Sequence, residues 1–390
     1  MTRSPNVRVI RTGPGGRMLA MTLTAGLMAM GGCAAQGQPV TKSEPASQTS
    51  QTRFPAVHED WSRMGYRMDW VGFPFVDAAP RGVLRDAAAF VDVFVIQDRQ
   101  STVSVLEAAT GKVRWSVDLA GPLTKFVAIT RDATNPDQIM VCSESEAFTL
   151  SLASSNLVGR ERFERVVNTR PVMAGGLGIF GTSTGEVYAH QFGQGTTAWA
   201  FRMNGAIEAD PILIGDTIGV VSIGEDVCFF SLGGSLLGRA RLFGAVATNP
   251  VTDGRSLLIA GLDQSVWSFD PSGLRLWRYR TSSPLRTQPT AHDGVLYVDV
   301  PGTGLVALDP TTGQQKWACK DLSDARVIGV RAGRLLAWTG RGLATVDPAT
   351  GDLVDRIQTP GVMNVYADRF VDGNLYGVSE RGVVGKFIPR

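Results

Sequence analysis

The sequence predicts an all-β fold built from eight copies of one four-stranded unit, and three observations lead to this prediction. A turn motif typified by Ala307–Trp317 (ALDPTTGQQKW) recurs along the chain. A proline that opens a strand recurs upstream of these turns at nearly constant spacing. One half of the motif stands alone near the N-terminus. Four short antiparallel strands in about 40 residues form one blade of a β-propeller, so we expect a single eight-bladed propeller.

The composition is that of a globular β protein. Of the 390 residues, 44% are hydrophobic and 19% are charged, and no long apolar stripe with the period of a helix is present. The formal net charge of +2 is misleading, because residues 1–32 hold four of the 38 basic residues and no acid. The remaining 34 basic residues face 36 acidic ones. This balance excludes the strongly basic surface expected of a nucleic-acid-binding protein.

Residues 1–32 have the layout of a secretion signal. A basic head precedes the apolar run Met18–Met30, which is shorter than the roughly 20 residues that span a bilayer. The small residues before Cys33 resemble the lipobox of bacterial lipoproteins. That resemblance implies a lipoprotein signal peptide over 1–32, cleavage before Cys33, and a lipid on the Cys33 thiol. The alternative is an ordinary cleaved signal in which Cys33 has no special role.

Residues 33–60 are expected to form a disordered tether. They are rich in Gln, Ser, Thr and Pro and nearly free of large apolar groups, so they cannot bury enough surface to fold. A chain of about 25 such residues reaches roughly 25–30 Å from end to end. Residues 61–390 then form one propeller domain.

The recurring motif predicts a strand, a tight hairpin and a second strand that ends in tryptophan. In the copy at 307–317, Asp309 accepts from backbone N–H groups, Pro310 presets the turn, and Gly313 supplies a positive φ. The tryptophan then lies on an outer strand, where its ring can pack against a neighbouring unit. The motif copies that keep this residue provide the structural repeat tryptophans Trp70, Trp115, Trp199, Trp277 and Trp317.

The strand-opening prolines mark the inner strands of the blades. Pro171, Pro211, Pro250 and Pro289 are spaced 40, 39 and 39 residues apart, and a missing N–H is tolerable at the start of a strand. The first strand of each propeller blade lines the central channel. The residues just before these prolines are therefore candidate channel-lining residues: Arg170, Asp210, Asn249 and Gln288. They could form a ligand ring, or they could merely solvate one another in a water-filled channel.

The segment 65–73 (GYRMDWVGF) is expected to close the ring. It matches the half of the motif that leads to tryptophan, while the last unit, 381–390, ends without its partner strand. We therefore expect an N-terminal strand to complete the last blade. Seven blades remain the alternative, because the segments 74–100 and 358–375 are irregular.

The repeats resemble the PQQ-like propeller repeat over about 66–390. With the lipobox, the tether and a single propeller, the chain also resembles the BamB family of envelope lipoproteins. This resemblance implies a non-enzymatic scaffold on the periplasmic side of the outer membrane, a monomer within a complex, which binds envelope proteins such as the β-barrel assembly complex. No cofactor, metal or nucleic acid is expected. Partner contacts are expected in the irregular segments 74–100 and 119–137, with Lys125 and Arg131 as exposed probes.

Two other functions remain open. One is an envelope propeller that binds a small molecule or glycan in its channel. The other is a diverged quinoprotein, since enzymes that use pyrroloquinoline quinone share this repeat. Such enzymes usually stack the quinone on a disulfide between adjacent cysteines, and no adjacent cysteines occur here.

The other reactive residue types predict no catalytic site. Cys142, Cys228 and Cys319 lack metal-binding spacing and are expected to be buried free thiols, with one disulfide in an oxidising compartment as the alternative. The three histidines, His58, His190 and His292, are far apart in sequence, and we expect each to lie on the surface or in a turn. Asp270, Asp309 and Asp347 head turns and are expected to accept hydrogen bonds there. No catalytic residue is assigned.

Overall fold

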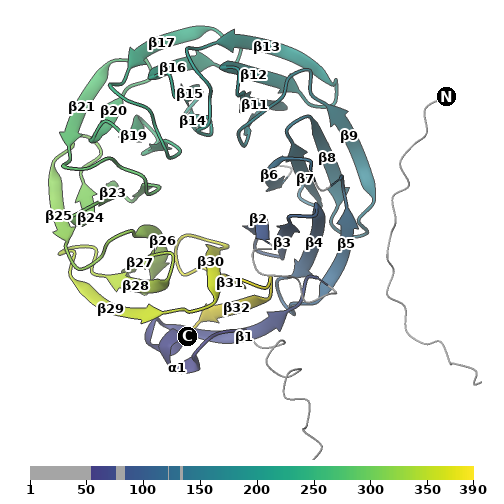
Figure 1. The fold of residues 1–390 in the computed structure, drawn as a ribbon, viewed down its shortest axis with the longest axis vertical. Helices are drawn as coiled ribbons and strands as arrows, with labels where there is room; N and C mark the ends of the chain where they lie inside the picture. The colour runs from purple at the N-terminus through teal and green to yellow at the C-terminus, as the bar shows by residue number, and fades with distance from the viewer. Residues whose placement is uncertain (1–53, 76–83, 122, 132–134) are drawn as a thin grey trace, which may run out of the picture.

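The chain folds into a ring of eight β-sheets around an open axis (Figure 1). The structure is a computed structural model that describes residues 54–75, 84–121, 123–131 and 135–390. Each sheet has four antiparallel strands; in seven blades the first strand along the chain lies nearest the axis, and in the eighth the innermost strand is β30 (Val362–Ala367). The eight-bladed, all-β propeller predicted from the sequence is confirmed. Cys33 and the expected signal peptide over 1–32 lie outside the described residues.

The first four blades follow one another along the chain. Blade 1 contains β2 (Leu84–Ala89), β3 (Val93–Asp98), β4 (Thr102–Glu107) and β5 (Val113–Asp118). Blade 2 contains β6 (Phe126–Arg131), β7 (Gln138–Ser143), β8 (Glu146–Ser151) and β9 (Leu157–Arg162). Blade 3 contains β10 (Val172–Ala174), β11 (Leu177–Gly181), β12 (Glu186–Gln191) and β13 (Thr196–Arg202). Blade 4 contains β14 (Ile212–Ile214), β15 (Thr217–Val221), β16 (Asp226–Ser231) and β17 (Leu236–Arg241).

The other four blades complete the ring. Blade 5 contains β18 (Val251–Thr252), β19 (Leu257–Gly261), β20 (Ser265–Phe269) and β21 (Arg275–Arg280). Blade 6 contains β22 (Thr290–His292), β23 (Val295–Val300), β24 (Gly304–Leu308) and β25 (Gln315–Cys319). Blade 7 contains β26 (Arg326–Arg331), β27 (Arg334–Trp338), β28 (Gly342–Val346) and β29 (Leu353–Gln358). Blade 8 contains β30 (Val362–Ala367), β31 (Leu375–Ser379), β32 (Val384–Pro389) and β1 (Tyr66–Gly72).

Blade 8 is the seam of the ring. Its outer strand β1 pairs antiparallel with β32, in a register that runs from Tyr66 opposite Pro389 to Gly72 opposite Val384. The two ends of the propeller therefore belong to one sheet, as Figure 1 shows where β1 lies beside β32. The predicted closure by an N-terminal strand is confirmed.

The turn between β24 and β25 shows how the repeated motif folds. The Asp309 carboxylate accepts from the backbone N–H groups of Thr311 and Thr312, at 2.9 and 3.0 Å. Gly313 adopts a φ of +71°, a conformation that costs a residue with a Cβ roughly 1–2 kcal/mol. The register then shifts between Ala307 and Leu308, so a bulge follows the turn. The Asp309 carboxylate thus serves as the acceptor of this turn.

Five tryptophans join neighbouring blades. The indole Nε1–H of each donates to a backbone carbonyl of the next blade, at the turn between its third and fourth strands, over 2.8–3.0 Å. In four of the five cases the ring lies against the glycine of that turn; a Cβ on Gly351 would lie 2.5 Å from the Trp317 ring. The donor and acceptor pairs are Trp70 with Ala108, Trp115 with Leu152, Trp199 with Leu232, Trp277 with Pro310, and Trp317 with Pro348.

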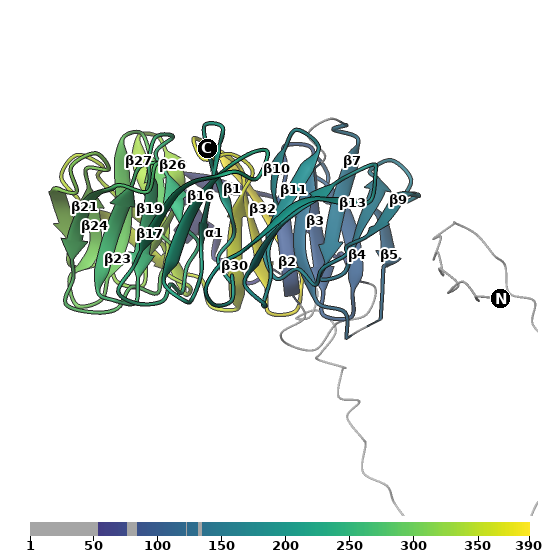
Figure 2. The ribbon, with the colours of Figure 1, turned by 90° about the horizontal axis from the view of Figure 1, so that it is seen from above.

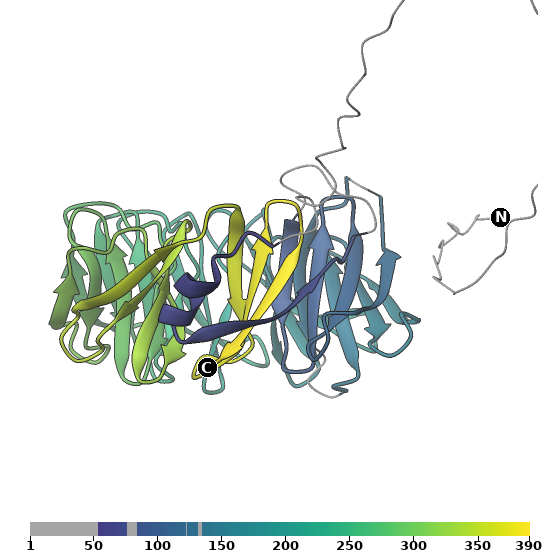
Figure 3. The same ribbon diagram turned by 90° about the horizontal axis from the view of Figure 1, so that it is seen from below.

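An N-terminal arm, residues 54–65, packs on the outside of the seam (Figure 3). It contains the helix α1 (His58–Arg63). Phe54 and Trp61 are 2% and 1% exposed, and the Trp61 ring stacks on Phe387 at a centroid distance of 3.5 Å. Both join the apolar cluster that fills the space between blades 7 and 8. The expected tether over 33–60 is therefore corrected at its end, because two large aromatic rings anchor residues 54–60 to the propeller.

The blades form a flat disc when the ring is seen from its edge (Figure 2). The core consists of eight apolar clusters, most of them between the faces of adjacent sheets. Within the described ranges, no helix has the length and apolar character needed to cross a bilayer.

Candidate functional site

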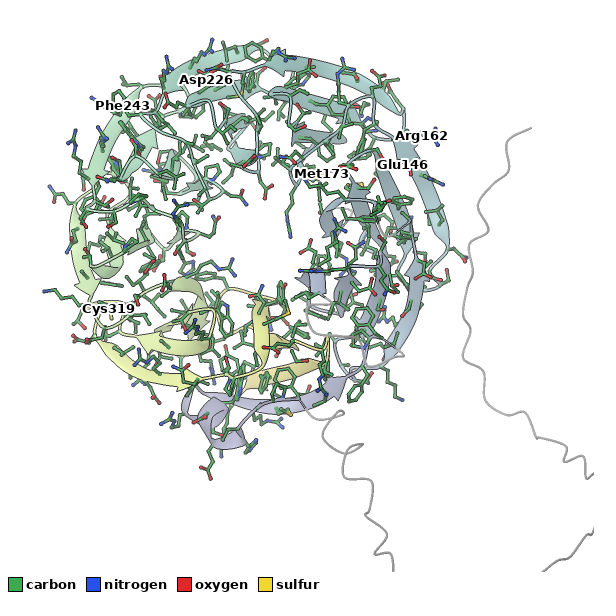
Figure 4. The ribbon with its side chains drawn as sticks, in the orientation of Figure 1. Glu146, Arg162, Met173, Asp226, Phe243 and Cys319 are labelled. Carbon is green, nitrogen blue, oxygen red and sulfur yellow. The ribbon has the colours of Figure 1, made fainter. Side chains whose placement is uncertain are left out.

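The four predicted channel residues lie together at the inner ends of blades 3 to 6. Each stands just before the innermost strand of its blade, and Figure 4 shows inner-strand side chains pointing toward the axis. The side chain of each later residue accepts from the backbone N–H of the one before. Arg170 donates to Asp210, Asp210 to Asn249, and Asn249 to Gln288, at 2.8, 2.8 and 3.0 Å. These bonds link four neighbouring blades in one direction around the ring.

Side-chain contacts strengthen this ladder. The Asn249 Nδ2 group donates to the second carboxylate oxygen of Asp210 at 2.7 Å, and the Gln288 Nε2 group donates to the Asn249 carbonyl at 3.0 Å. The Arg170 guanidinium donates to Asp86 of blade 1 at 2.7 Å and forms an ion pair with it. The four predicted residues therefore bind one another or a neighbouring blade.

Sequence reasoning missed four further members of this ring. Strand register places Asp86, Ala128, Arg326 and Asn364 at the corresponding positions of blades 1, 2, 7 and 8. No proline follows any of them, so the marker used for the other blades was absent. The signal that could have found them is spacing, because the eight ring positions follow one another at intervals of 38 to 42 residues.

The ring is partly buried, and this burial shifts the pKa values of its ionisable side chains. Burial raises the pKa of Asp86 and that of Asp210, while the nearby Arg170 lowers both. Burial also lowers the pKa of Arg326, and the nearby Tyr366 phenol acts in the opposite direction. Among the described residues, Arg170 is shared by both carboxylates, whereas Arg326 forms no ion pair.

His190 corrects one expectation. It lies in β12, fully buried, rather than on the surface or in a turn. Its Nδ1 atom lies 3.0 Å from the Tyr188 hydroxyl, and its Nε2 atom lies 3.0 Å from a carboxylate oxygen of Glu161 in blade 2. Both ring nitrogens have partners, so burial costs this side chain little. His190 thus joins blades 2 and 3.

The other two histidines and the cysteines lie apart. His58 is exposed at the start of α1, and His292 lies at the end of β22 with its ring 4.2 Å from that of Phe370. A shallow hollow beside His292, with a volume of about 240 Å³, is lined by the turns of blades 5 and 6. Cys142, Cys228 and Cys319 are free and buried. No group of three or more His, Cys, Asp or Glu in the described ranges is placed to hold a metal.

The irregular segments contain more regular structure than expected. The described part of 74–100 includes β2 and β3, and that of 119–137 includes β6. Lys125 donates to the Asn168 side chain, and Arg131 pairs with Asp92 and lies over the Phe90 ring. These two cations hold the blades together, so they are unsuitable as probes of a partner surface.

An exposed apolar patch lies on the outer strands of blades 4 and 5. We define this rim patch as Leu236 and Leu237 of β17 with Leu274 and Leu276 at β21. These side chains are 42–62% exposed. β17 touches the turn that precedes β21, because a Cβ on Gly238 would lie 2.2 Å from the Ser272 carbonyl carbon. Gly238 stands where other outer strands have tryptophan, so the backbones approach closely here.

The comparisons with known proteins agree on the architecture. The family model described as outer membrane protein assembly factor BamB matches residues 99–237 and 183–384. The crystal structure of BamB from Moraxella catarrhalis is 16% identical, with a TM-score of 0.62, and the match covers 78% of this chain and 93% of that chain. The computationally designed Ika8 protein is 12% identical, with a TM-score of 0.65, and the match covers 80% of this chain and 97% of that one. Among curated protein sequences, none matches this chain.

Identities this low show a shared fold alone. A designed protein has this shape too, so the shape of the ring carries no function by itself. The family match rests on the sequence and covers most of the propeller.

Proposed function

The chain belongs to the family of the outer membrane protein assembly factor BamB, and from this membership we propose a non-enzymatic, protein-binding scaffold that serves β-barrel assembly in the outer membrane. The family match is the observation that carries the proposal. It is supported by the polar ring, in which the side chains of the four predicted members hydrogen-bond to one another or, for Arg170, to Asp86. Rigid blades that present exposed side chains at a rim suit a docking platform.

The N-terminal sequence supports a proposal for the cellular location of the protein. We propose that residues 1–32 are removed, that Cys33 carries a lipid, and that the propeller faces the periplasm from the outer membrane. Residues from Cys33 to the arm then link the lipid to the ring. The partner is the β-barrel assembly complex, in which the chain acts as a single copy without a cofactor.

The rim patch is the surface that we assign to this partner. Its four leucines are exposed, and they lie on β17 and at the start of β21, where β17 contacts the turn that precedes β21. Exposed apolar clusters of this kind mark protein-binding surfaces more often than scattered single residues do. Blade 2 offers a matched comparison, because Leu157 and Val158 are similarly exposed at the start of its outer strand.

Capture from native envelopes with mass spectrometry tests the proposal. The full-length chain should capture the β-barrel assembly complex. Leu237→Asp with Leu276→Asp should lower that capture about tenfold, which corresponds to a loss of about 1.4 kcal/mol. Leu157→Asp with Val158→Asp should leave it unchanged.

The possible outcomes distinguish an error in the proposed function from an error in the proposed contact surface. If the assembly complex is absent from the wild-type capture, the proposed function is wrong. If both double variants capture the assembly complex as well as the wild type does, the function stands and the rim patch is not the contact.

Fractionation of Cys33→Ala tests the proposed location. A normally processed variant that stays on the membrane would contradict lipidation at Cys33.

A further inference from the structure

The hydrogen-bond ladder around the channel stops between blades 6 and 7. At each step from blade 3 to blade 6, a side-chain oxygen of the next blade accepts the backbone N–H of the ring residue before it. The next ring residue after Gln288 is Arg326, which aligns by register with the other ring positions. Arginine has only donors. It therefore cannot accept the Gln288 N–H as Asp210, Asn249 and Gln288 accept those before them.

Two donors without acceptors are left at this step. In the part of the chain that the structure describes, the Gln288 backbone N–H has no hydrogen-bond acceptor within the protein. The Arg326 guanidinium likewise has no hydrogen bond and no ion pair among the described residues. Arg326 is half-buried. A guanidinium keeps its charge at neutral pH even when it is partly buried.

The contrast with Arg170 shows what Arg326 lacks. Arg170 stands at the same ring position in blade 3, and its guanidinium is neutralised by Asp86 at 2.7 Å. Ala128, the ring residue of blade 2, is too short to intervene, so Arg170 reaches across to blade 1. For Arg326, the ionisable group that acts on its pKa is Tyr366 of β30, a phenol that is neutral at physiological pH. One ring arginine thus has a carboxylate partner, and the other has none.

We propose that the channel binds a small oxyanion, a carboxylate or a phosphate group, at Arg326 between blades 6 and 8. The guanidinium supplies the charge and a bidentate pair of donors, which suits both groups. The anion pairs with the Arg326 guanidinium as the Asp86 carboxylate pairs with that of Arg170. This site goes beyond the proposed scaffold function and does not depend on it.

Thermal unfolding of the full-length chain tests the site. The probes are sodium phosphate and sodium acetate, each titrated against sodium chloride at equal ionic strength. At one hundred times its Kd, a bound oxyanion should raise the melting temperature by about 4 °C for a chain of this size. Arg326→Gln should abolish this rise. It should also keep its stability without anion, because Gln offers the acceptor found at the other ring steps.

Two further variants serve as controls. Arg334→Gln removes an exposed arginine from β27 of the same blade and should respond like the wild type. Arg326→Lys keeps the charge but loses the planar pair of donors, so its Kd should rise about tenfold. Equilibrium dialysis with labelled phosphate or acetate should find one site per chain.

The two probes distinguish the sources of the oxyanion. A rise with acetate alone assigns a carboxylate ligand, and a rise with phosphate alone assigns a phosphorylated one; both support the site. The proposal is overturned if neither probe shifts the wild type, or if Arg326→Gln responds as the wild type does.

Discussion

At four of the eight blade junctions, a single indole makes two different contacts. Its Nε1–H satisfies a turn carbonyl of the next blade, and its ring covers the glycine of that turn. The Asp at the head of the same turn acts only locally, because its carboxylate accepts from its own turn. Both residues recur in the repeats of this chain. Their contributions to the stability of the fold are nevertheless very different.

Substitution of these two residues should separate the contributions. Trp317→Ala should lower the free energy of unfolding by about 3–5 kcal/mol, because a buried ring and its hydrogen bond are lost together. Asp309→Ala should cost about 1 kcal/mol, the value of an exposed turn hydrogen bond. Urea unfolding of both variants measures the difference. Equal losses would show that the indole does not hold blade 6 to blade 7.

Among the elements, the N-terminal arm is the one that departs from the repeat. Blade 7 has Asp355 at the position of the repeat tryptophan, and the arm fills the space between blades 7 and 8 instead. Gly377 and Gly385 make room for the Phe54 ring; a Cβ on either would lie within 2.9 Å of it. Arg63 adds an ion pair with Asp355 at 3.7 Å. The arm is thus a part of the folded domain.

Truncation and substitution should locate the start of this domain. A chain without residues 1–53 should keep its melting temperature. Phe54→Ala should lower the free energy of unfolding by about 3–5 kcal/mol, since it empties a fully buried aromatic site. The control Val57→Ala, which changes an exposed side chain, should stay within about 0.5 kcal/mol. A silent Phe54→Ala variant would place the start of the domain after the arm.

The sequence predicts the repeated blades better than it predicts the elements that depart from the repeat, and particular residues show why. The half-motif around Trp70, which no inner strands precede, predicted the closure of the ring and contributed to the count of eight blades. Phe54 and Trp61 left no signal, because two aromatic residues around a six-residue helix form no periodic pattern. Arg326 and Asn364 were missed because bulges shift their strands and no proline marks them. His190 looked isolated, since its partner Glu161 lies in another blade.

On the scale of the whole molecule, the ring depends on one strand pairing at the seam. Deletion of residues 1–75 removes the arm and β1 and leaves β32 as an unpaired edge, which favours edge-to-edge association. We expect this chain to aggregate in light scattering, whereas the chain without 1–53 remains monomeric. A monomeric 1–75 deletion with an unchanged melting temperature would mean that the ring closes without β1.

The position of the arm also determines how the protein bears a mechanical load. A force applied on the N-terminal side of residue 54 acts first on Phe54 and then on Trp61, whose rings are both buried beside blade 8. The arm must peel away as far as Gly65 before any tension reaches β1 and its pairing with β32. It therefore provides strain relief for the seam. A propeller held by its N-terminus can yield by the length of the arm while its ring stays closed.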